Sequence, residues 1–485
     1  MGFHPLIRKH RPMATVHQNS TEREIQQTLH ELRGRLSGQL IEPQDPLYEE
    51  ARAVWNGMVD VRPVAIARAG AVSDIDAVLD AAQRSGLALA VRGGGHNIAG
   101  HGTVEGGLVL DLGALRYVHV DAGNGLVTVG PGATLADVDR ATAAHGLAVP
   151  LGVISGTGVA GLTLGGGVGW LTRSYGLTLD SLEAVDVVTA GGDHLHASER
   201  KNTELFWGLR GGGGNFGVAS SFAFRAHPLP ATPLGGNFFY RPQHWRNALM
   251  AFAAWTRNLP EQMNPIISFL VLPPEFGMGD EPWMAIGFAW ASADLQTGLG
   301  LVEQLRVQVP PDEQEMGPTS WLDWQSAMDT VFPKGSRGYW KNVSFSRLDE
   351  EVVGVLLSFA SELAWQGTGI DIHHLEGAFG RVPEDATSFP NRSARFWLNV
   401  YGFWKDPAED ERLTAFARKA YALMQPFSEH GEYVNFLGAE LGQQDTDAAR
   451  RSYGQDKYQR LVAIKNRYDP QNVFRYNHNI LPAPV

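Results

Sequence analysis

A histidine stands directly behind three glycines in the segment VRGGGHNIAGHG, residues 91–102. Glycine loses more conformational freedom on folding than any other residue, so backbone this bare is costly to order. Such a segment indicates a place where a ligand approaches the main chain closely. His96 stands where that ligand would bind.

Two further glycine clusters follow, GVISGTGVAGLTLGGGVG at residues 152–169 and GLRGGGGNFG at residues 208–217. Bare N–H groups from several such loops can converge on a phosphate-bearing ligand. No cluster fits the P-loop pattern, and none forms the strand–GxGxxG–helix unit of a Rossmann fold. The alternative is a glycine-rich domain with many tight turns. The three clusters together favour a large nucleotide held by several loops.

Two segments further along the chain place polar and aromatic residues together. In RFWLNVYGFW, strand alternation puts Trp397, Asn399 and Tyr401 on one face and apolar residues on the other. Such a face suits a sheet that covers a bound ligand, and the alternative is a half-solvated antiparallel sheet. In EYVNFLGAELG, Tyr433 and Asn435 share one face of another expected strand.

Histidine pairs raise the question of a metal site. His373 and His374 are neighbours, and neighbours on a strand point to opposite faces, so the two cannot easily bind one ion. His194 and His196 stand in an expected hairpin turn with only Asp193 nearby. We therefore expect no metal.

The elements that must position these residues follow from local signals. A ragged tail at residues 1–20 precedes a helix that begins at Thr21, where TERE offers a capping box. From about residue 60 strands alternate with helices, and one helix is expected to be capped by Ser73 and ended by Gly86. The segment EAVDVVTAGGDHLHA predicts a β-hairpin.

Tryptophan marks a change of organisation along the chain. Ten of the 13 tryptophans lie between residues 226 and 435, where the glycine clusters stop. We therefore expect a domain boundary near residue 225 and a return to the first domain near residue 436. A length of 485 residues agrees with two domains.

Composition excludes several classes of protein. A net charge of −12, from 40 basic and 52 acidic residues, argues against nucleic acid as a partner. The chain has no cysteine, which excludes disulfides, thiolate nucleophiles and cysteine-bound metals. No apolar segment follows the charged N-terminus, and none approaches the length of a transmembrane helix. We expect a cytoplasmic protein with no membrane partner.

Four segments, RGGGHNIAG, GVAGLTLGGGVGWL, LFWGLRGGGGNFGV and YDPQNVFRYNHNI, resemble a known family in their sequence and their order. They resemble the berberine-bridge-enzyme-like flavoproteins of the vanillyl-alcohol-oxidase fold family, and most of all its bacterial members similar to 6-hydroxynicotine oxidase. The resemblance runs from about residue 45 to the C-terminus.

The resemblance implies an α+β fold with two domains, a PCMH-type FAD-binding domain and a substrate domain built on an antiparallel sheet flanked by helices. The implied parts are an N-terminal tail and helix (1–40), the FAD-binding domain (41–225), the substrate-binding domain (226–435) and a C-terminal return to the FAD-binding domain (436–485).

The resemblance also implies how FAD is held. His96 would bond covalently to the flavin 8α-methyl carbon, and this link would be single because Ile154 stands where some relatives carry a second, cysteinyl link. Thr157 falls at the site thought to govern oxygen access, and Leu162 replaces a histidine of some relatives. The implied cofactor-binding residues, besides His96, are Arg92, Gly93, Gly94, Gly95, Asn97, Gly100, His101, Val153, Gly156, Thr157, Gly158, Gly161, Leu162, Gly165, Gly166, Gly169, Gly217, Val218, Tyr476 and Asn477.

Catalytic roles follow from the same resemblance. Tyr433 would be the catalytic base, Asn435 and Tyr401 would be further catalytic residues, and Trp397 and Asn399 would line the substrate pocket. A free tyrosine has a pKa of about 10, so Tyr433 needs a nearby cation or hydrogen bonds to act as a base near neutral pH. The sequence does not identify that helper.

The implied activity is oxidation of a small molecule at a C–H next to a hydroxyl or an amine. Hydride would pass to flavin N5, and oxygen would be the acceptor, giving hydrogen peroxide. Two alternatives stay open. One is a dehydrogenase that passes electrons to another acceptor, and the other is a flavin-binding protein without turnover.

Overall fold

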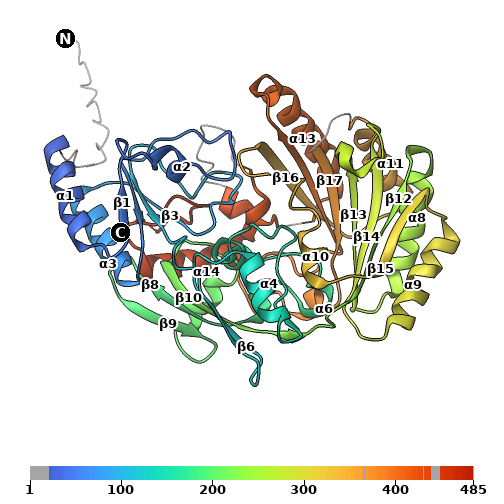
Figure 1. The fold of residues 1–485 in the computed structure, drawn as a ribbon, viewed down its shortest axis with the longest axis horizontal. Helices are drawn as coiled ribbons and strands as arrows, with labels where there is room; N and C mark the ends of the chain where they lie inside the picture. Colours follow the sequence, from blue (N-terminus) through green and yellow to red (C-terminus); the bar gives the residue numbers. More distant parts are fainter. Residues whose placement is uncertain (1–20, 332, 364–367, 430, 439–447, 484–485) are drawn as a thin grey trace, which may run out of the picture.

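The computed structural model describes residues 21–331, 333–363, 368–429, 431–438 and 448–483. Two smaller sheets occupy one half of the molecule, and a seven-stranded sheet with its helices occupies the other (Figure 1). The predicted tail at residues 1–20 lies outside the described residues.

The first sheet has the order β1 (Gln39–Ile41), β2 (Ala65–Arg68), β4 (Leu108–Asp111), β3 (Leu89–Arg92), with β1 antiparallel and the other strands parallel. Helices α1 (Glu22–Arg35) and α3 (Ser73–Ser85) share a hydrophobic core with this sheet. The capping box at Thr21 and the left-handed Gly86 at the end of α3 are confirmed.

The predicted cap of α3 was wrong by one residue. Ser73 already belongs to the helix, and the N-cap is Val72, which makes no side-chain cap bond. The carboxylate of Asp74 instead accepts the N–H of Gly70, in the loop before α3, and the N–H of Ser37, in the segment that follows α1.

The second sheet is antiparallel, in the order β5 (Val118–Asp121), β6 (Leu126–Val129), β10 (Val218–Arg225), β8 (Leu182–Val188), β9 (His194–Ser198). Strands β8 and β9 form the predicted hairpin, in which Val188 pairs with His194. The placement of His194 and His196 in the turn was wrong, since both lie on β9, where they pair with Asp76 and Asp186.

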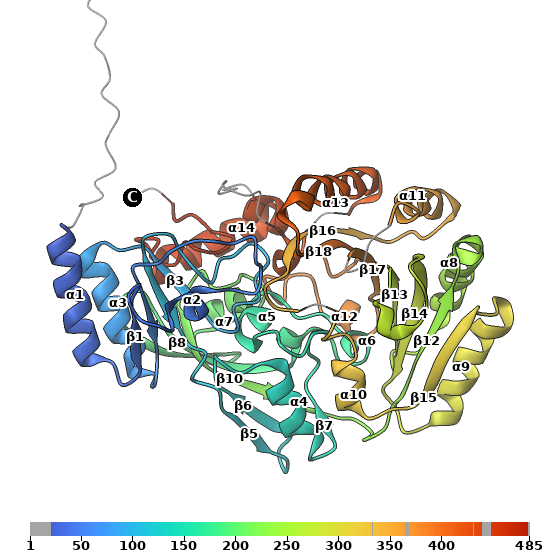
Figure 2. The ribbon, with the colours of Figure 1, turned by 45° about the horizontal axis from the view of Figure 1, so that its top comes forward.

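The third sheet carries seven antiparallel strands. Their order is β15 (Glu313–Pro318), β12 (Leu234–Tyr240), β14 (Trp283–Trp290), β13 (Met263–Leu270), β17 (Thr368–His374), β18 (Phe396–Trp404), β16 (Arg337–Phe345). The helices α8 (Trp245–Trp255), α9 (Leu295–Gln308), α11 (Glu350–Ala360) and α13 (Asp410–Met424) cover one face of this sheet (Figure 2). The apolar face of β18 packs into their core, and every residue of β18 is buried, so the half-solvated alternative is excluded.

Several helices lie close to the glycine loops and the cavity described below. They are α4 (Leu135–Ala143), α5 (Val159–Gly165), α7 (Thr203–Leu209), α10 (Trp321–Ser326) and α14 (Ala448–Tyr468). The C-terminal helix α14 packs on α7 and lies beside the second sheet, although α14 follows that sheet by more than 200 residues in the sequence (Figure 1). The remaining short elements are α2 (Tyr48–Arg52), β7 (Leu147–Ala148), α6 (Thr172–Tyr175), β11 (His227–Pro228) and α12 (Ala378–Arg381). Throughout the described ranges, no helix is both long enough and apolar enough to cross a bilayer.

Candidate active site

A cavity of about 300 Å³ lies between the glycine loops and the open face of β16, β17 and β18. The C-terminal segment from Phe474 to His478 closes part of its wall. Most of the predicted site residues line this cavity, namely Arg92, Gly93, Gly94, Gly95, His96, Asn97, His101, Val153, Thr157, Gly158, Gly161, Leu162, Gly217, Val218, Asn399, Tyr401, Tyr433, Asn435, Tyr476 and Asn477. Segments from distant parts of the sequence therefore meet at one site.

The glycines of the first two loops allow the main chains to touch. A Cβ on Gly94 would lie 2.5 Å from the Cα of Gly158, a distance that real Cβ atoms do not reach. Gly161 and Gly214, by contrast, have open space where a Cβ would stand, and both line the cavity. Side chains at these two positions would fill a cradle that the bare backbone leaves free.

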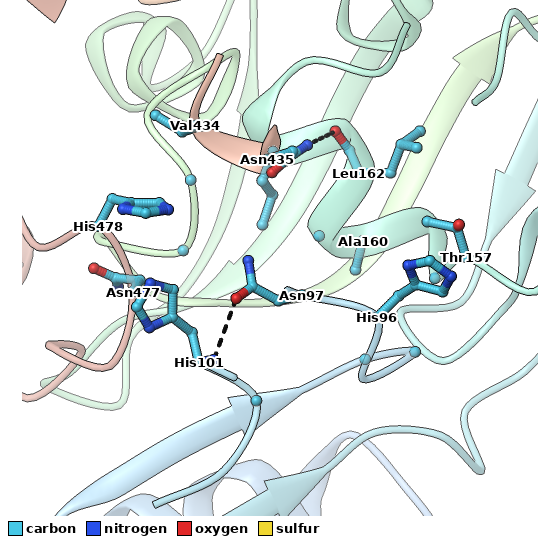
Figure 3. Close-up of a pocket in the computed structure, with 18 of the residues that line it drawn as sticks. His96, Asn97, His101, Thr157, Ala160, Leu162, Val434, Asn435, Asn477 and His478 are labelled. Carbon is cyan, nitrogen blue, oxygen red and sulfur yellow. Dashed lines mark hydrogen bonds between the residues drawn. The ribbon is translucent and has the colours of Figure 1, made fainter. Parts of the chain in front are cut away.

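His96 lies at one end of the cavity, beside Thr157 (Figure 3). Its Nε2 is buried and has no hydrogen-bond partner in the protein. Burial lowers the pKa of His96 to about 4, because an uncharged environment disfavours the imidazolium. The ring is therefore neutral near pH 7, with one nitrogen directed at no protein group.

The opposite end of the cavity gathers polar groups around His101 (Figure 3). The rings of His101 and His478 meet edge to face at 4.8 Å, and the backbone N–H of His101 donates to Asn97 Oδ1. His101 Nε2 and Asn477 Oδ1 are buried without partners. Buried polar atoms are normally paired, so these two indicate a polar ligand at this end.

Arg92 supplies positive charge along the same wall. Its Nη2 donates to Asp111 Oδ2 at 3.0 Å and to the carbonyl of Ala51, while Nη1 is buried without a partner. Arg92 is the only lysine or arginine among the described residues that line the cavity. An unpaired guanidinium N–H here suits an anionic ligand group.

Five predicted cofactor-binding glycines are not part of the cavity wall. They are Gly100, Gly156, Gly165, Gly166 and Gly169. A Cβ on Gly165 would lie 2.3 Å from Asn435 Oδ1, and one on Gly166 would lie 2.7 Å from Tyr433 Cε2. These two glycines therefore leave room for the side chains of Tyr433 and Asn435, and cofactor binding by the five glycines stays a prediction.

Tyr433 and Asn435 lie side by side, although not on a strand. Residues Val434–Phe436 form a single 3₁₀ turn, so the predicted strand was wrong. The Tyr433 hydroxyl accepts hydrogen bonds from the Gly167 N–H at 2.7 Å and from Asn435 Nδ2 at 2.9 Å. Burial outweighs both bonds and raises the pKa of Tyr433 to about 12, so its hydroxyl stays protonated at neutral pH.

Trp397 is not part of the cavity wall, so its assignment to the substrate pocket stays a prediction. Its ring stacks on Tyr433 at 4.9 Å and lies with Phe389 in a hydrophobic cluster behind the wall. Asn399 and Tyr401, on the same face of β18, do reach the cavity. Trp397 therefore supports a wall residue without contacting the cavity.

The sequence reasoning missed Asp371 and assigned no role in the cavity to His373. Both lie on β17 and line the cavity because Asp371 pairs with Asn399 in the sheet register. The hydroxyls of Ser268 and Tyr401 bind the Asp371 carboxylate, and its Oδ1 is buried without a partner. Burial raises the pKa of Asp371 to about 6.

His373 and His374 lie on opposite faces of β17, as strand alternation predicts. His373 faces the cavity, whereas His374 lies on the other side and contacts Glu376 at 2.7 Å. Among the described residues, no three His, Cys, Asp or Glu side chains are placed to hold a metal ion.

Comparisons with known proteins agree with this geometry. The family model described as FAD binding domain matches residues 63–198, and the model described as berberine and berberine like matches residues 432–481. The (R)-6-hydroxynicotine oxidase of Paenarthrobacter nicotinovorans is 29% identical over 474 residues, which cover 92% of this chain and 97% of that protein. The chain is an FAD-linked oxidoreductase, and its structural neighbours include berberine-bridge-enzyme-like oxidases.

Solved structures share the fold of this oxidoreductase. The 6-hydroxy-D-nicotine oxidase from Arthrobacter nicotinovorans superposes with a TM-score of 0.83 at 25% identity, covering 92% of this chain and 98% of that one. The glucooligosaccharide oxidase from Acremonium strictum, whose structure is described with a 6-S-cysteinyl, 8α-N1-histidyl FAD, gives a TM-score of 0.82 at 22% identity and covers 95% and 100%. The predictions of a two-domain α+β fold and of FAD as cofactor are confirmed.

The cavity of this oxidoreductase fits FAD on two structural grounds. The open cradle at Gly161 and Gly214 admits a ligand against bare main chain. The unpartnered atoms of Arg92, His101 and Asn477 offer donors and acceptors to a ligand that carries charge and hydroxyl groups. These residues are the ones we expect to hold the cofactor.

Proposed function

We propose that this FAD-linked oxidoreductase carries its flavin on a single covalent link to His96 and oxidises a CH–OH or CH–N group of a small molecule. The observation that carries the proposal is the buried His96 Nε2, which has no protein partner and lies in the wall of the FAD cavity. Since the chain has no cysteine, a second thioether link is impossible.

The chemistry of His96 supports the link. A neutral imidazole nitrogen keeps its lone pair available as a nucleophile, and the lowered pKa keeps the ring neutral throughout the physiological range. The glucooligosaccharide oxidase with the same fold is described with a histidyl FAD, which agrees with a histidine in this role. Ile154 lines the cavity but offers no group that could bond the flavin.

We propose that Asp371, rather than Tyr433, accepts the proton from the substrate heteroatom. When bound, the flavin would supply a two-electron acceptor for the hydride, with oxygen as the final acceptor and hydrogen peroxide as the product. Asp371 has a free Oδ1 directed into a buried site and a pKa of about 6, so it is ionised at neutral pH. A base needs a pKa near the working pH, and Asp371 meets that requirement while Tyr433 does not.

The neighbours of Asp371 take supporting roles in this proposal. The Tyr401 hydroxyl donates to the carboxylate and fixes its orientation. Asn399 lies opposite Asp371 on β18, and its unpartnered Oδ1 can accept a hydrogen bond from the substrate. Tyr433 and Asn435 brace the turn at residues 434–436 against the glycines that end α5.

We also propose which parts of the chain bind FAD and which part binds the substrate. Residues 41–225 and 436–485 form the FAD-binding domain, and residues 226–435 form the substrate-binding domain. The packing of α14 on α7 and the position of Phe474 to His478 in the cavity wall support the return of the C-terminal part. The position of Asp371 and Asn399 on the third sheet supports the substrate role of the middle part.

Acid precipitation of the purified protein tests the proposal. Flavin absorbance is expected in the pellet of the wild type and in the supernatant for His96→Ala. Anaerobic addition of candidate amines and alcohols, in separate samples, is expected to bleach the flavin with one class, and air is expected to restore it with release of peroxide. Bleaching that only a quinone or protein acceptor reverses would replace the oxidase by a dehydrogenase.

A further inference from the structure

Trp55 covers one face of the His96 ring. The two ring centroids lie 4.9 Å apart with an interplanar angle of 29°, and Trp55 is only 5% exposed. The backbone N–H of Trp55 also donates to the carbonyl of Gly95, the residue before His96. Trp55 lies outside the matched FAD-binding segment, and nothing in its local sequence points to the site.

The segment that carries Trp55, residues 54–57, is held at both ends. Asn56 is buried, and its Nδ2 donates to the carbonyls of Ile98 and Gly338, at 2.7 Å and 2.9 Å. Its Oδ1 accepts the N–H of Gly338 at 3.1 Å. The carbonyl of Trp55 accepts the N–H of Gly335 at 2.9 Å. This segment therefore joins the His96 loop to the start of β16 in the third sheet.

The indole of Trp55 is fixed by aromatic neighbours as well as by its backbone. Phe403 meets it edge to face at 5.1 Å, and Trp340 lies at 6.2 Å. Both neighbours come from the third sheet and line the cavity. A ring held on three sides cannot rotate away from His96 without breaking these contacts.

We propose that Trp55 is the positioning residue for flavinylation, holding the His96 imidazole by stacking so that Nε2 points into the cavity. This inference rests on the proposed histidyl link. Stacking blocks one face of the imidazole, excludes water from it and restricts its rotation, while Nε2 on the ring edge has no protein partner. Restricting a nucleophile to one reactive geometry removes entropy from the barrier to bond formation.

The linkage that Trp55 would assist is an oxidation, with molecular oxygen as the oxidant. A new C–N bond forms between the imidazole nitrogen and the flavin 8α carbon, at the expense of one methyl C–H bond and one imidazole N–H bond. The two electrons released pass through the flavin to molecular oxygen, and the two protons complete hydrogen peroxide. No group of Trp55 enters the reaction, so its effect is confined to the rate of linkage.

A time course of covalent incorporation tests the role of Trp55. Flavin-free full-length protein is mixed with FAD in air, and acid-stable flavin is followed alongside total bound flavin. Trp55→Leu keeps an apolar side chain over His96 and loses the flat ring, so the rate of linkage should fall on the order of 10- to 100-fold. Total flavin bound before acid treatment should not change.

Two further variants separate positioning from a loss of structure. Trp55→Phe keeps an aromatic ring for stacking and should restore most of the wild-type rate. Phe345→Leu removes a fully buried ring from β16 that does not line the cavity, and this variant should flavinylate like the wild type. Melting curves of the three variants report whether each is folded.

The outcomes distinguish this inference from the proposed function. Wild-type protein that releases all its flavin in acid overturns the link to His96 and, with it, the role of Trp55. Acid-stable flavin in the wild type together with an unchanged linkage rate in Trp55→Leu overturns the role of Trp55 alone. A rate in Trp55→Phe as low as in Trp55→Leu also overturns it, because stacking is then irrelevant.

Discussion

Asp139 is a buried acid whose ionisation should cost stability. It lies on α4 with 1% exposure, at the contact with α10. Trp321 Nε1 donates to its Oδ1 at 3.2 Å, and its Oδ2 has no partner. Burial raises the pKa of Asp139 to about 7, helped by repulsion from Asp329 and opposed by the bond from Trp321. The folded protein therefore prefers the neutral carboxyl.

The size of the effect follows from linkage. An unfolded aspartate has a pKa of about 3.9, so the shift is about 3 units and corresponds to about 4 kcal/mol. Between pH 4 and pH 7 the unfolded chain loses this proton while the folded chain keeps it. Stability from this site therefore falls as pH rises, and above pH 7 the full penalty of about 4 kcal/mol is present.

Asp139→Asn removes the titration and keeps an acceptor for Trp321. The free energies of unfolding of the wild type and the variant are measured with urea and tryptophan fluorescence. Relative to the wild type, the variant should gain about 4 kcal/mol of stability between pH 4 and pH 8. A difference that is the same at both pH values would refute the reasoning.

Asp137, two residues away on α4, provides a control of opposite sign. Burial raises its pKa, but hydrogen bonds from Arg116 and Thr134 outweigh burial, so the net pKa is lowered. Its stabilising contribution is present above the unfolded pKa and is lost as pH falls. Asp137→Asn should therefore be less stable than the wild type at pH 8 and should lose that deficit on acidification.

Three further predictions concern the site and its support. Asp371→Asn should keep its flavin, and its kcat should fall about 100- to 10,000-fold. The kcat/KM of the wild type should rise with pH through about 6. A flat pH profile together with an active variant would show that Asp371 is not the base. Lys465→Met leaves the buried Asp469 charge without its partner at 2.6 Å, so the free energy of unfolding in urea should fall by about 3–5 kcal/mol. The double variant that also carries Asp469→Leu has no unpaired charge and should lose less stability. In a His96→Ala background, where FAD is not covalently held, Gly161→Ala adds a Cβ that meets open space in the protein. Its melting temperature should stay unchanged while FAD binding, measured by equilibrium dialysis, weakens. Undiminished binding would show that the cradle is not used.

The cofactor end of the site could be predicted from the sequence because its signals are local. Each glycine cluster identifies a segment of the cavity wall, although the second contains the helix α5 as well as loop. The strand before the first cluster ends at Arg92, directly before the glycines. Gly94 and Gly158 must lack a side chain because a Cβ on either would collide with the main chain of the other, and the residue type alone indicates such a close approach. No long-range information is needed to recognise such loops as ligand-binding.

The substrate end could not be predicted, because it depends on strand pairing. Asp371 reaches the cavity only through its register with Asn399, which lies 28 residues later on β18. Trp55 reaches His96 through hydrogen bonds to two separate segments. Alternation on β18 identified a face, but not which of its residues would meet the cavity and which, like Trp397, would lie behind it.

The glycines and Tyr433 share one physical limit on prediction: the residue type does not show which neighbour the residue serves. A glycine required by a neighbouring side chain looks the same in sequence as one required by a ligand, and Gly165 and Gly166 are of the first kind. Tyr433 carries the functional group of a base, but its burial could not be known until the turn at residues 434–436 was placed against α5.

The central claim, a flavin bonded to His96, is tested most directly by peptide mass. Cleavage after arginine should release residues 93–116 as one peptide, which contains both His96 and His101. We expect this peptide to carry the added mass of one flavin, with fragment ions that place it on His96. An unmodified peptide, or a flavin on His101, would contradict the account.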